Sequence, residues 1–297
     1  MRTISSIVLI FLVGGLMQSC GYQASNKASK QISQTAEHLT LAKLVVKTKN
    51  GSIDIKGDPS LASVEISAKI TCGGSSQEEA DRRIALATLS IVRDENRVLT
   101  IEPVFPDGRR HGDGASITVR LPDTDGIDAR SSNGRIVVVG LGGELKADTS
   151  NGSVEVVDHF GSATLKSSNG RVTARNIAGD LDAHTSNARI VGENIGGSVT
   201  ARTSNGRVTL ILDENQSGPI DVKTSNASVA ITVGPAFSGH VTFDTSNGSV
   251  KLSDPAGLIV AEDFDRRHRD GEIQVGSGDA KSRIDTSNAS ITFTISG

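Results

Sequence analysis

The sequence lacks the residues from which most protein cores of its size are built. It has no tryptophan, one tyrosine and seven phenylalanines, so aromatic residues make up only 3% of 297 positions. An ordinary globular core of this length uses more large rings. The 32 glycines, together with many serines, threonines, valines and asparagines, favour a thin, layered core. Composition therefore points to a repetitive fold.

Charge, histidine and cysteine are also sparse. The net charge is −3, which argues against a general nucleic-acid binder. The six histidines are scattered without the spacing of metal ligands, and no Ser-His-Asp or phosphate-binding glycine motif is present. We therefore predict no metal, no cofactor and no catalytic residue. Cys72 is predicted to be a buried, inert thiol, the alternative being a reactive one.

Long hydrophobic runs are absent, and the longest extends from Ile4 to Met17. It is too short for a membrane-spanning helix, which needs about 20 residues. With Arg2 before it, it predicts a secretory signal peptide over residues 1–19. Cys20, directly after Ser19, resembles the lipobox cysteine of bacterial lipoproteins. That resemblance implies a lipid on Cys20 and an exported chain held at a membrane of the bacterial envelope, facing either the cell surface or the periplasm. The alternative is a cleaved signal with an incidental cysteine.

The segment that follows, residues 20–38, is rich in serine, glutamine, alanine and lysine. Such a composition does not bury enough apolar surface to offset the entropy of ordering. We predict a flexible tether here.

A Ser-Asn-Gly or Ser-Asn-Ala tripeptide recurs through the rest of the chain. Five copies recur at one constant spacing, two follow at a slightly longer one, and the last comes after an interval nearly twice as long. Their asparagines are Asn133, Asn151, Asn169, Asn187, Asn205, Asn226, Asn247 and Asn288. A fixed period of about 20 residues is the signature of a solenoid. Apolar residues alternate with polar ones on both sides of each tripeptide, as in Leu181 and Ala183 or Val208 and Leu210, which indicates two half-buried strands.

These repeats predict an all-β fold, a single-stranded parallel β-solenoid over residues 126–297, in which each strand pairs with its equivalent one period away. The asparagines are expected to stack in a hydrogen-bonded ladder and to adopt the left-handed backbone of the corner. Asn288 is expected about two turns beyond Asn247. The alternative, that the asparagines bind a ligand, is less favoured.

Residues 39–125 predict a first rung and an N-terminal cap. Asn50-Gly51 repeats the corner, and strands are expected over Val64–Ala68, Arg97–Glu102 and Ser116–Leu121. The segment Ser76–Glu79 has the pattern of a capping box and predicts a helix over about 77–91. A cap is expected because an open solenoid end exposes unpaired backbone.

Together, the Thr-Ser-Asn-Gly repeats, the Asn50-Gly51 rung and the insertion that carries the helix resemble the bacterial family named putative adhesin, related to the head domains of autotransporter adhesins. The resemblance covers about Leu41 to Gly297. It implies a right-handed parallel β-helix at the cell surface or in the periplasm. Periodicity alone also suits a left-handed triangular coil.

Arginine recurs two positions after the asparagine, at Arg135, Arg171, Arg189 and Arg207. Stacked at about 4.8 Å, the last three would form a cationic stripe suited to phosphate or carboxylate groups of an envelope polysaccharide. The alternative is a solvated face. The excursion Leu258–Lys281 is either a functional loop or a mobile insertion.

The first functional hypothesis is therefore a non-enzymatic adhesin-like display or binding module that contacts the membrane through its lipid, and an envelope polysaccharide or a surface protein through its flat side. A second hypothesis is a periplasmic structural or envelope-stress protein that binds a partner protein. The third is a carbohydrate-active enzyme, since glycoside cleavage needs two converging carboxylates and parallel β-helices can host such sites.

Overall fold

The structure is a computed structural model that describes residues 26–296, arranged in two compact units that meet in the chain between Val137 and Val138. The predicted signal peptide and Cys20 lie outside the described residues. Within them, α1 (Gln77–Leu86) is the one α-helix and every other regular element is a β-strand. This part of the chain contains no helix with the length and apolarity needed to cross a membrane.

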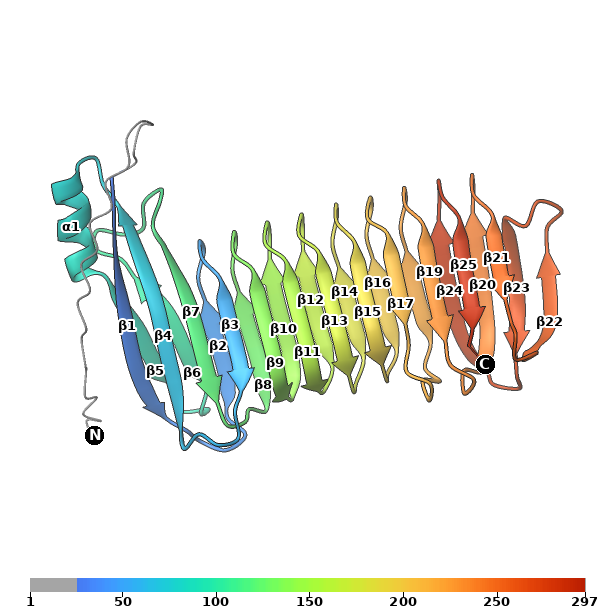
Figure 1. Cartoon of the computed structure of the whole chain (residues 1–297), viewed down its shortest axis with the longest axis horizontal. Helices are drawn as coiled ribbons and strands as arrows, with labels where there is room; N and C mark the ends of the chain where they lie inside the picture. The colour runs from blue at the N-terminus through green and yellow to red at the C-terminus, as the bar shows by residue number, and fades with distance from the viewer. Residues whose placement is uncertain (1–25, 297) are drawn as a thin grey trace. The chain divides into compact units, whose positions relative to one another are not determined.

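The first unit contains two sheets, with strand orders β1-β4-β7-β3 and β5-β6-β2-β8 (Figure 1). The strands are β1 (Lys27–Glu37), β2 (Lys43–Lys47), β3 (Ile53–Gly57), β4 (Ser63–Gly73), β5 (Thr88–Arg93), β6 (Leu99–Val104), β7 (Gly114–Leu121) and β8 (Gly126–Arg130). Strand β2 lies between β6 and β8 and is parallel to both, and β3 is parallel to β7. The rung that comes first in the sequence is therefore an inner one, with the cap built outside it.

Strand β1 corrects the tether prediction, because Lys27–Glu37 belongs to the sheet. It pairs antiparallel with β4 over its whole length, from Lys27 opposite Gly73 to Glu37 opposite Ser63. Its side chains are small or polar and none is fully buried. The strand is thus stabilised through its backbone hydrogen bonds to β4 rather than through apolar side chains of its own, and composition does not report such a contribution.

The helix begins as predicted but ends five residues early. Ser76 is its N-cap, and the Ser76 hydroxyl accepts a hydrogen bond from the Glu79 amide. The carboxylate of Glu79 accepts from Ser75 rather than from Ser76, so the capping box is only half formed. The chain turns extended at Ala87 and continues as β5. The β-branched residues of this stretch, Thr88, Ile91 and Val92, favour a strand over a helix.

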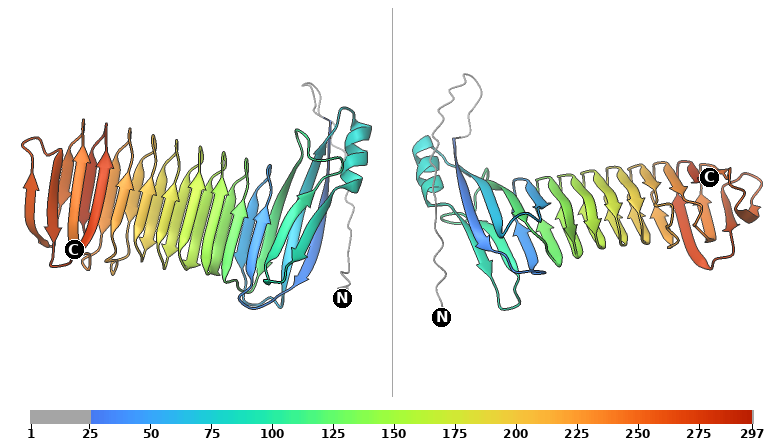
Figure 2. Two further views of the ribbon diagram at one scale, coloured as in Figure 1. Left: turned by 180° about the vertical axis from the view of Figure 1, so that it is seen from behind. Right: turned by 60° about the horizontal axis from the view of Figure 1, so that its bottom comes forward.

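Strand β9 (Ile136–Gly142) runs across the boundary in the chain. The second unit is the predicted parallel β-solenoid, and its successive turns are visible in Figure 2. Its strands are β10 (Glu144–Thr149), β11 (Val154–Phe160), β12 (Ala163–Ser167), β13 (Val172–Ile177), β14 (Leu181–His184), β15 (Ile190–Ile195), β16 (Val199–Arg202), β17 (Val208–Ile211), β18 (Ile220–Lys223), β19 (Val229–Val233), β20 (Gly239–Thr245), β21 (Val250–Ser253), β22 (Ile259–Phe264), β23 (Asp270–Val275), β24 (Ala280–Thr286) and β25 (Ile291–Ile295).

Each regular strand pairs in parallel with its equivalent one period along the chain, as the repeats predict. Val172 lies opposite Ile190, which lies opposite Val208, so each step between rungs is one period of the repeat. The inward positions are apolar and fully buried on every rung, so they form continuous columns of Val, Ile, Leu and Ala. This arrangement explains the shortage of aromatic residues, since the narrow interior is filled by aliphatic side chains.

The last rung in the sequence is not the last in space. Strand β24 lies between β18 and β20, and β25 lies between β19 and β21. The prediction that Asn288 follows two turns beyond Asn247 is therefore wrong. The chain builds the outer rung β20–β21 first and then returns to fill the position next to β18–β19.

The excursion Leu258–Lys281 forms the end of one sheet. Strands β22 and β23 pair antiparallel with each other, and β23 pairs antiparallel with β20. The ring of Phe264 stacks on Phe243 at a centroid distance of 5.9 Å and on His268 at 5.5 Å. The excursion thus covers the outer rung instead of projecting away from it.

Candidate functional site

The candidate site is a column of three exposed arginines, Arg171, Arg189 and Arg207, which we term the arginine column. Each precedes a buried strand residue of β13, β15 or β17, and those residues lie in register on successive rungs. The amide of Val172 donates to the carbonyl of Arg189 at 3.2 Å, and the amide of Ile190 donates to Arg207 at 3.0 Å. The three side chains therefore leave the backbone at the spacing of adjacent strands, about 4.8 Å.

The arginine column has no acidic neighbour. None of its three side chains forms an ion pair with any residue between 26 and 296. The equivalent positions on the flanking rungs are Ser153 and Ser228. Like charges directly opposite one another on adjacent strands destabilise a sheet, so the column carries a repulsion that the protein itself does not relieve.

Other outward-facing arginines of the second unit are paired. Arg175 lies 2.7 Å from Glu193 and Arg202 lies 2.6 Å from Asp221, in both cases on the adjacent rung. Arg283 lies 2.8 Å from Asp285 on its own strand. These pairs show that the solenoid readily places a carboxylate beside a surface arginine, which it does not do along the arginine column.

Arg135, the fourth predicted member of the stripe, belongs to the first unit. Its side chain lies 3.3 Å from the carboxylate of Asp54. Because that carboxylate already occupies the guanidinium, Arg135 differs in electrostatics from the other three. Sequence spacing alone groups all four, whereas the structure separates one from the rest.

The asparagine side chains form a hydrogen-bonded ladder in each unit. In the first unit, the amide of Asn133 donates to Asn50 at 2.6 Å. In the second, the donor–acceptor distances between neighbouring amides are 2.7–2.9 Å, in the order Asn151, Asn169, Asn187, Asn205, Asn226, Asn288 and Asn247. The amides thus use each other as partners, which identifies the ladder as architecture.

The expectation that these asparagines adopt the left-handed backbone is wrong, since none of them has a positive φ. A second corner carries that conformation, at Gly140, Asp158, Asn176 and Asn194, with φ between 53° and 68°. Asn176 donates to Asp158 at 2.6 Å and Asn194 donates to Asn176 at 3.0 Å. These four positions recur with the same period as the corner asparagines, which was the signal in the sequence that would have revealed this second ladder.

The residue after the ladder asparagine is small because the adjacent rung approaches closely. A Cβ atom on Gly170 would lie 1.7 Å from the carbonyl oxygen of Gly152, and one on Gly206 would lie 1.7 Å from that of Ala188. Neither glycine has a positive φ. Close approach, rather than conformational freedom, therefore selects glycine at these two positions.

No family model matches the chain, and no curated protein matches it. Among solved structures, the chain is similar to a putative adhesin from Bacteroides fragilis, at 14% identity over 89% of this chain and 97% of that one, with a TM-score of 0.37. It is similar to a putative adhesin from Parabacteroides distasonis, at 11% identity over 91% and 98%, with a TM-score of 0.40. It is also similar to a putative lipid binding protein from Parabacteroides distasonis, at 10% identity over 90% and 97%, with a TM-score of 0.37.

Putative adhesins are thus among the solved structures that the chain is similar to, which is also the name of the family that its repeats resemble. Identities of 10–14% and TM-scores of 0.37–0.40 carry no argument about function. The case for a function rests on the residues of this chain.

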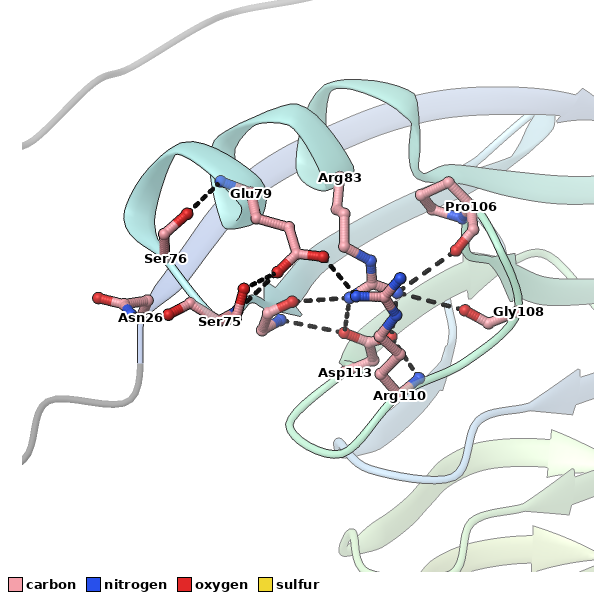
Figure 3. Close-up of polar contacts among 10 residues, drawn as sticks. Asn26, Ser75, Ser76, Glu79, Arg83, Pro106, Gly108, Arg110 and Asp113 are labelled. Carbon is pink, nitrogen blue, oxygen red and sulfur yellow. Dashed lines mark hydrogen bonds and ion pairs between the residues drawn. The ribbon is translucent and has the colours of Figure 1, made fainter.

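A buried ion pair in the cap is the strongest electrostatic feature outside the solenoid (Figure 3). The guanidinium of Arg83 and the carboxylate of Asp113 form two hydrogen bonds of 2.8 Å, and both side chains are at most 1% exposed. Asp113 also accepts from the amides of Gly73 and Arg110. Burial alone would raise the pKa of Asp113, but these four hydrogen bonds outweigh it and hold the pKa below its ordinary value.

This network positions loops rather than substrates. Arg83 also donates to the carbonyls of Gly73, Pro106 and Gly108, which joins α1 to the segment between β6 and β7 (Figure 3). Both oxygens of Asp113 already accept two hydrogen bonds, so the carboxylate has no lone pair left for a ligand. The sequence gives no sign of this pair, because its two members lie 30 residues apart.

The remaining titratable groups do not converge on a site. In the described part of the chain, no group of three or more His, Cys, Asp or Glu side chains is placed to hold a metal ion. Cys72 is fully buried with a free thiol, and burial raises its pKa. His159 is buried at the return corner, where its Nε2 lies 2.9 Å from the carbonyl of Gly143.

Proposed function

We propose that the protein is a non-enzymatic, adhesin-like binding module of the bacterial cell envelope that holds an anionic polysaccharide along the arginine column. The observation that carries the proposal is the stacking of three exposed arginines on successive rungs without a carboxylate beside any of them. An anionic ligand would relieve the repulsion between these arginines, and the flat surface of parallel strands offers an extended polymer room to lie along it.

The chemistry of the guanidinium group specifies the class of ligand. Arginine presents a planar fork of donors that matches carboxylate and phosphate groups in bidentate geometry. Three such forks at regular spacing suit a polymer with repeating anionic groups better than a single small anion. Uncharged polymers gain nothing from the arginine column.

The test measures binding of the full chain to polygalacturonate, a polyanion, and to dextran, a neutral polymer, by biolayer interferometry. We expect binding to polygalacturonate only, with an affinity that falls as salt rises. Combining Arg171→Ala, Arg189→Ala and Arg207→Ala should abolish it. The matched control is Arg202→Ala with Arg283→Ala, which removes two exposed arginines that already have acidic partners.

Three results would contradict the proposal. Equal loss of binding in the control variant would point to net charge instead of the arginine column, and binding that survives the triple change would place the site elsewhere. Shortening of the bound polymer, measured by size-exclusion chromatography, would favour a carbohydrate-active enzyme over a binding module.

Attachment to the envelope through Cys20 is the second part of the proposal and is supported by the sequence of the signal region. When cells that produce the chain are fed a radiolabelled fatty acid, we expect label in the protein and in the membrane fraction. Cys20→Ala should lose both. A Cys20→Ala variant that keeps the label, or stays in the membrane fraction to the same extent, would refute acylation at this residue.

A further inference from the structure

We infer that strand β1 is a self-association edge, on which a second copy of this chain adds its own β1 in antiparallel orientation around a two-fold axis at Ile32. β1 is the terminal strand of its sheet and pairs only with β4. It pairs in continuous register from Lys27 to Glu37, without a bulge or a proline. Its other side therefore presents an uninterrupted row of backbone donors and acceptors, which is a template for another strand.

Hydrogen bonds fix which residues face the open side. The carbonyl of Asn26 accepts from the amide of Gly74 and so points toward β4. Since backbone groups alternate in direction along a strand, those of the next residue, Lys27, and of every second residue after it point away from β4. Two side chains agree with this assignment, because Gln77 donates to the carbonyl of Lys27 and Arg93 donates to that of Glu37.

Four residues of this row, Ser29, Gln31, Ser33 and Thr35, lie between the two that side chains already engage. Their outward amides and carbonyls have no partner among residues 26–296, because β4 occupies only the other side of the strand. In a symmetric pair, Ser29 lies opposite Thr35 of the second copy, and Gln31 lies opposite Ser33. Both members of each pair face the junction, so the amides and carbonyls of these residues satisfy one another across the two-fold axis.

The sequence of β1 is complementary to itself in this register. The two-fold axis at Ile32 sets Lys27 against Glu37 of the second copy, and the reverse pair forms at the other end. Both side chains are exposed, and neither forms an ion pair within the described residues. Opposite charges across adjacent strands stabilise a sheet. A register displaced by two residues would lose both charge pairs, and one displaced by an odd number would misalign the backbone groups.

Strand β22 shows what a protected edge looks like in the same protein. It is also terminal in its sheet, has a register shift between Ile259 and Ala261, and carries Glu262 and Asp263 beside it. Bulges and charges of one sign are the usual means of preventing edge-to-edge pairing. β1 has no bulge, and its charges of opposite sign at the two ends favour pairing with a second copy.

The first test is disulfide trapping of the full chain in the membranes of cells that produce it. In the proposed register the two Ile32 residues form a non-hydrogen-bonded pair, with Cα atoms about 4.5 Å apart, which a disulfide can bridge. Ile32→Cys should therefore give a covalent dimer on a non-reducing gel. The matched control is Thr35→Cys, because in the same dimer the two positions lie about 20 Å apart along the strands. The unchanged chain, whose Cys72 is buried, sets the background.

The second test reverses the charges. Lys27→Glu or Glu37→Lys alone turns two attractive pairs into two repulsive ones. In sedimentation of the full chain in nonionic detergent, each should weaken the dimer by about tenfold. The double variant restores opposite charges across the junction and should restore the affinity. That rescue distinguishes pairing from an effect on folding.

The inference fails if the chain sediments as a monomer at all concentrations, if Thr35→Cys is trapped as readily as Ile32→Cys, or if the double variant is no tighter than the single ones. A disulfide from Ile32→Cys to a different protein would also overturn it. Because all the residues tested lie in the first unit, these outcomes are independent of binding at the arginine column.

Discussion

The asparagine ladder of the second unit allows a quantitative prediction that depends on position. Asn187 donates to Asn169 at 2.7 Å and accepts from Asn205 at 2.9 Å. Asn247 forms only one bond within the ladder, a donation to Asn288 at 2.8 Å. A hydrogen bond contributes about 0.5–1.5 kcal/mol to stability, and these amides are exposed. Asn187→Ala should therefore cost about 1–2 kcal/mol of the free energy of unfolding, and Asn247→Ala about half of that.

A second substitution at the same position tests the direction of the ladder. Asn187→Asp keeps the acceptor but replaces the donating amide with an oxygen that faces the oxygen of Asn169. We expect a larger loss than for Asn187→Ala at neutral pH. Acidification through the pKa of the new carboxyl should recover part of it, because the protonated group donates again. The second ladder already obeys this rule, since its one aspartate, Asp158, accepts from Asn176 and donates to no neighbour.

Guanidinium unfolding followed by far-UV circular dichroism gives the free energies, with Asn187→Ala and Asn247→Ala measured side by side at two pH values. Equal losses for the interior and terminal positions would mean that the amide bonds do not determine the cost. A variant Asn187→Asp as stable as the native chain at neutral pH would refute the donor–acceptor order on which the prediction rests.

Two other predictions concern buried charge. Burial lowers the pKa of His159 below its ordinary value of 6.5, so the native state disfavours a proton that the unfolded chain accepts; stability should fall as the pH drops below about 6.5, and His159→Gln should remove that part of the pH dependence of the unfolding midpoint. In the cap, Arg83→Met leaves Asp113 buried without its partner and should cost about 3–5 kcal/mol, seen as a lower midpoint in thermal unfolding. Adding Asp113→Asn should recover most of the loss, and a double variant no more stable than Arg83→Met would contradict this account.

The sequence predicts the solenoid well because its register is repeated in residue types. The inward positions of β13, β15 and β17 recur once in every repeat as Val172, Ile190 and Val208. Any slip by one residue would expose these side chains. The corner asparagines and the arginine column are likewise predictable, because their positions follow from the same period.

The order of the end rungs was not predictable from the same pattern. Val229, Ile291 and Val250 occupy equivalent inward positions on three neighbouring rungs, and their side chains are nearly interchangeable in volume and polarity. Period and residue type therefore specify that a strand belongs in the stack, but not between which neighbours it lies. Strand β1 was missed for a related reason, since its backbone, rather than apolar side chains, joins it to the sheet.

The position of β24 and β25 has a consequence for how the molecule is completed. During synthesis, the outer rung β20–β21 emerges from the ribosome before the strands that will separate it from β18–β19. Strands β24 and β25 are thus the wedge that joins the outer rung to the rest of the array. A protein truncated before them does not simply become one turn shorter; it is left with unpaired strand edges on both sides of a gap. Loss of these two strands would therefore expose adhesive surface in the interior of the stack, where premature termination is most readily detected by proteases.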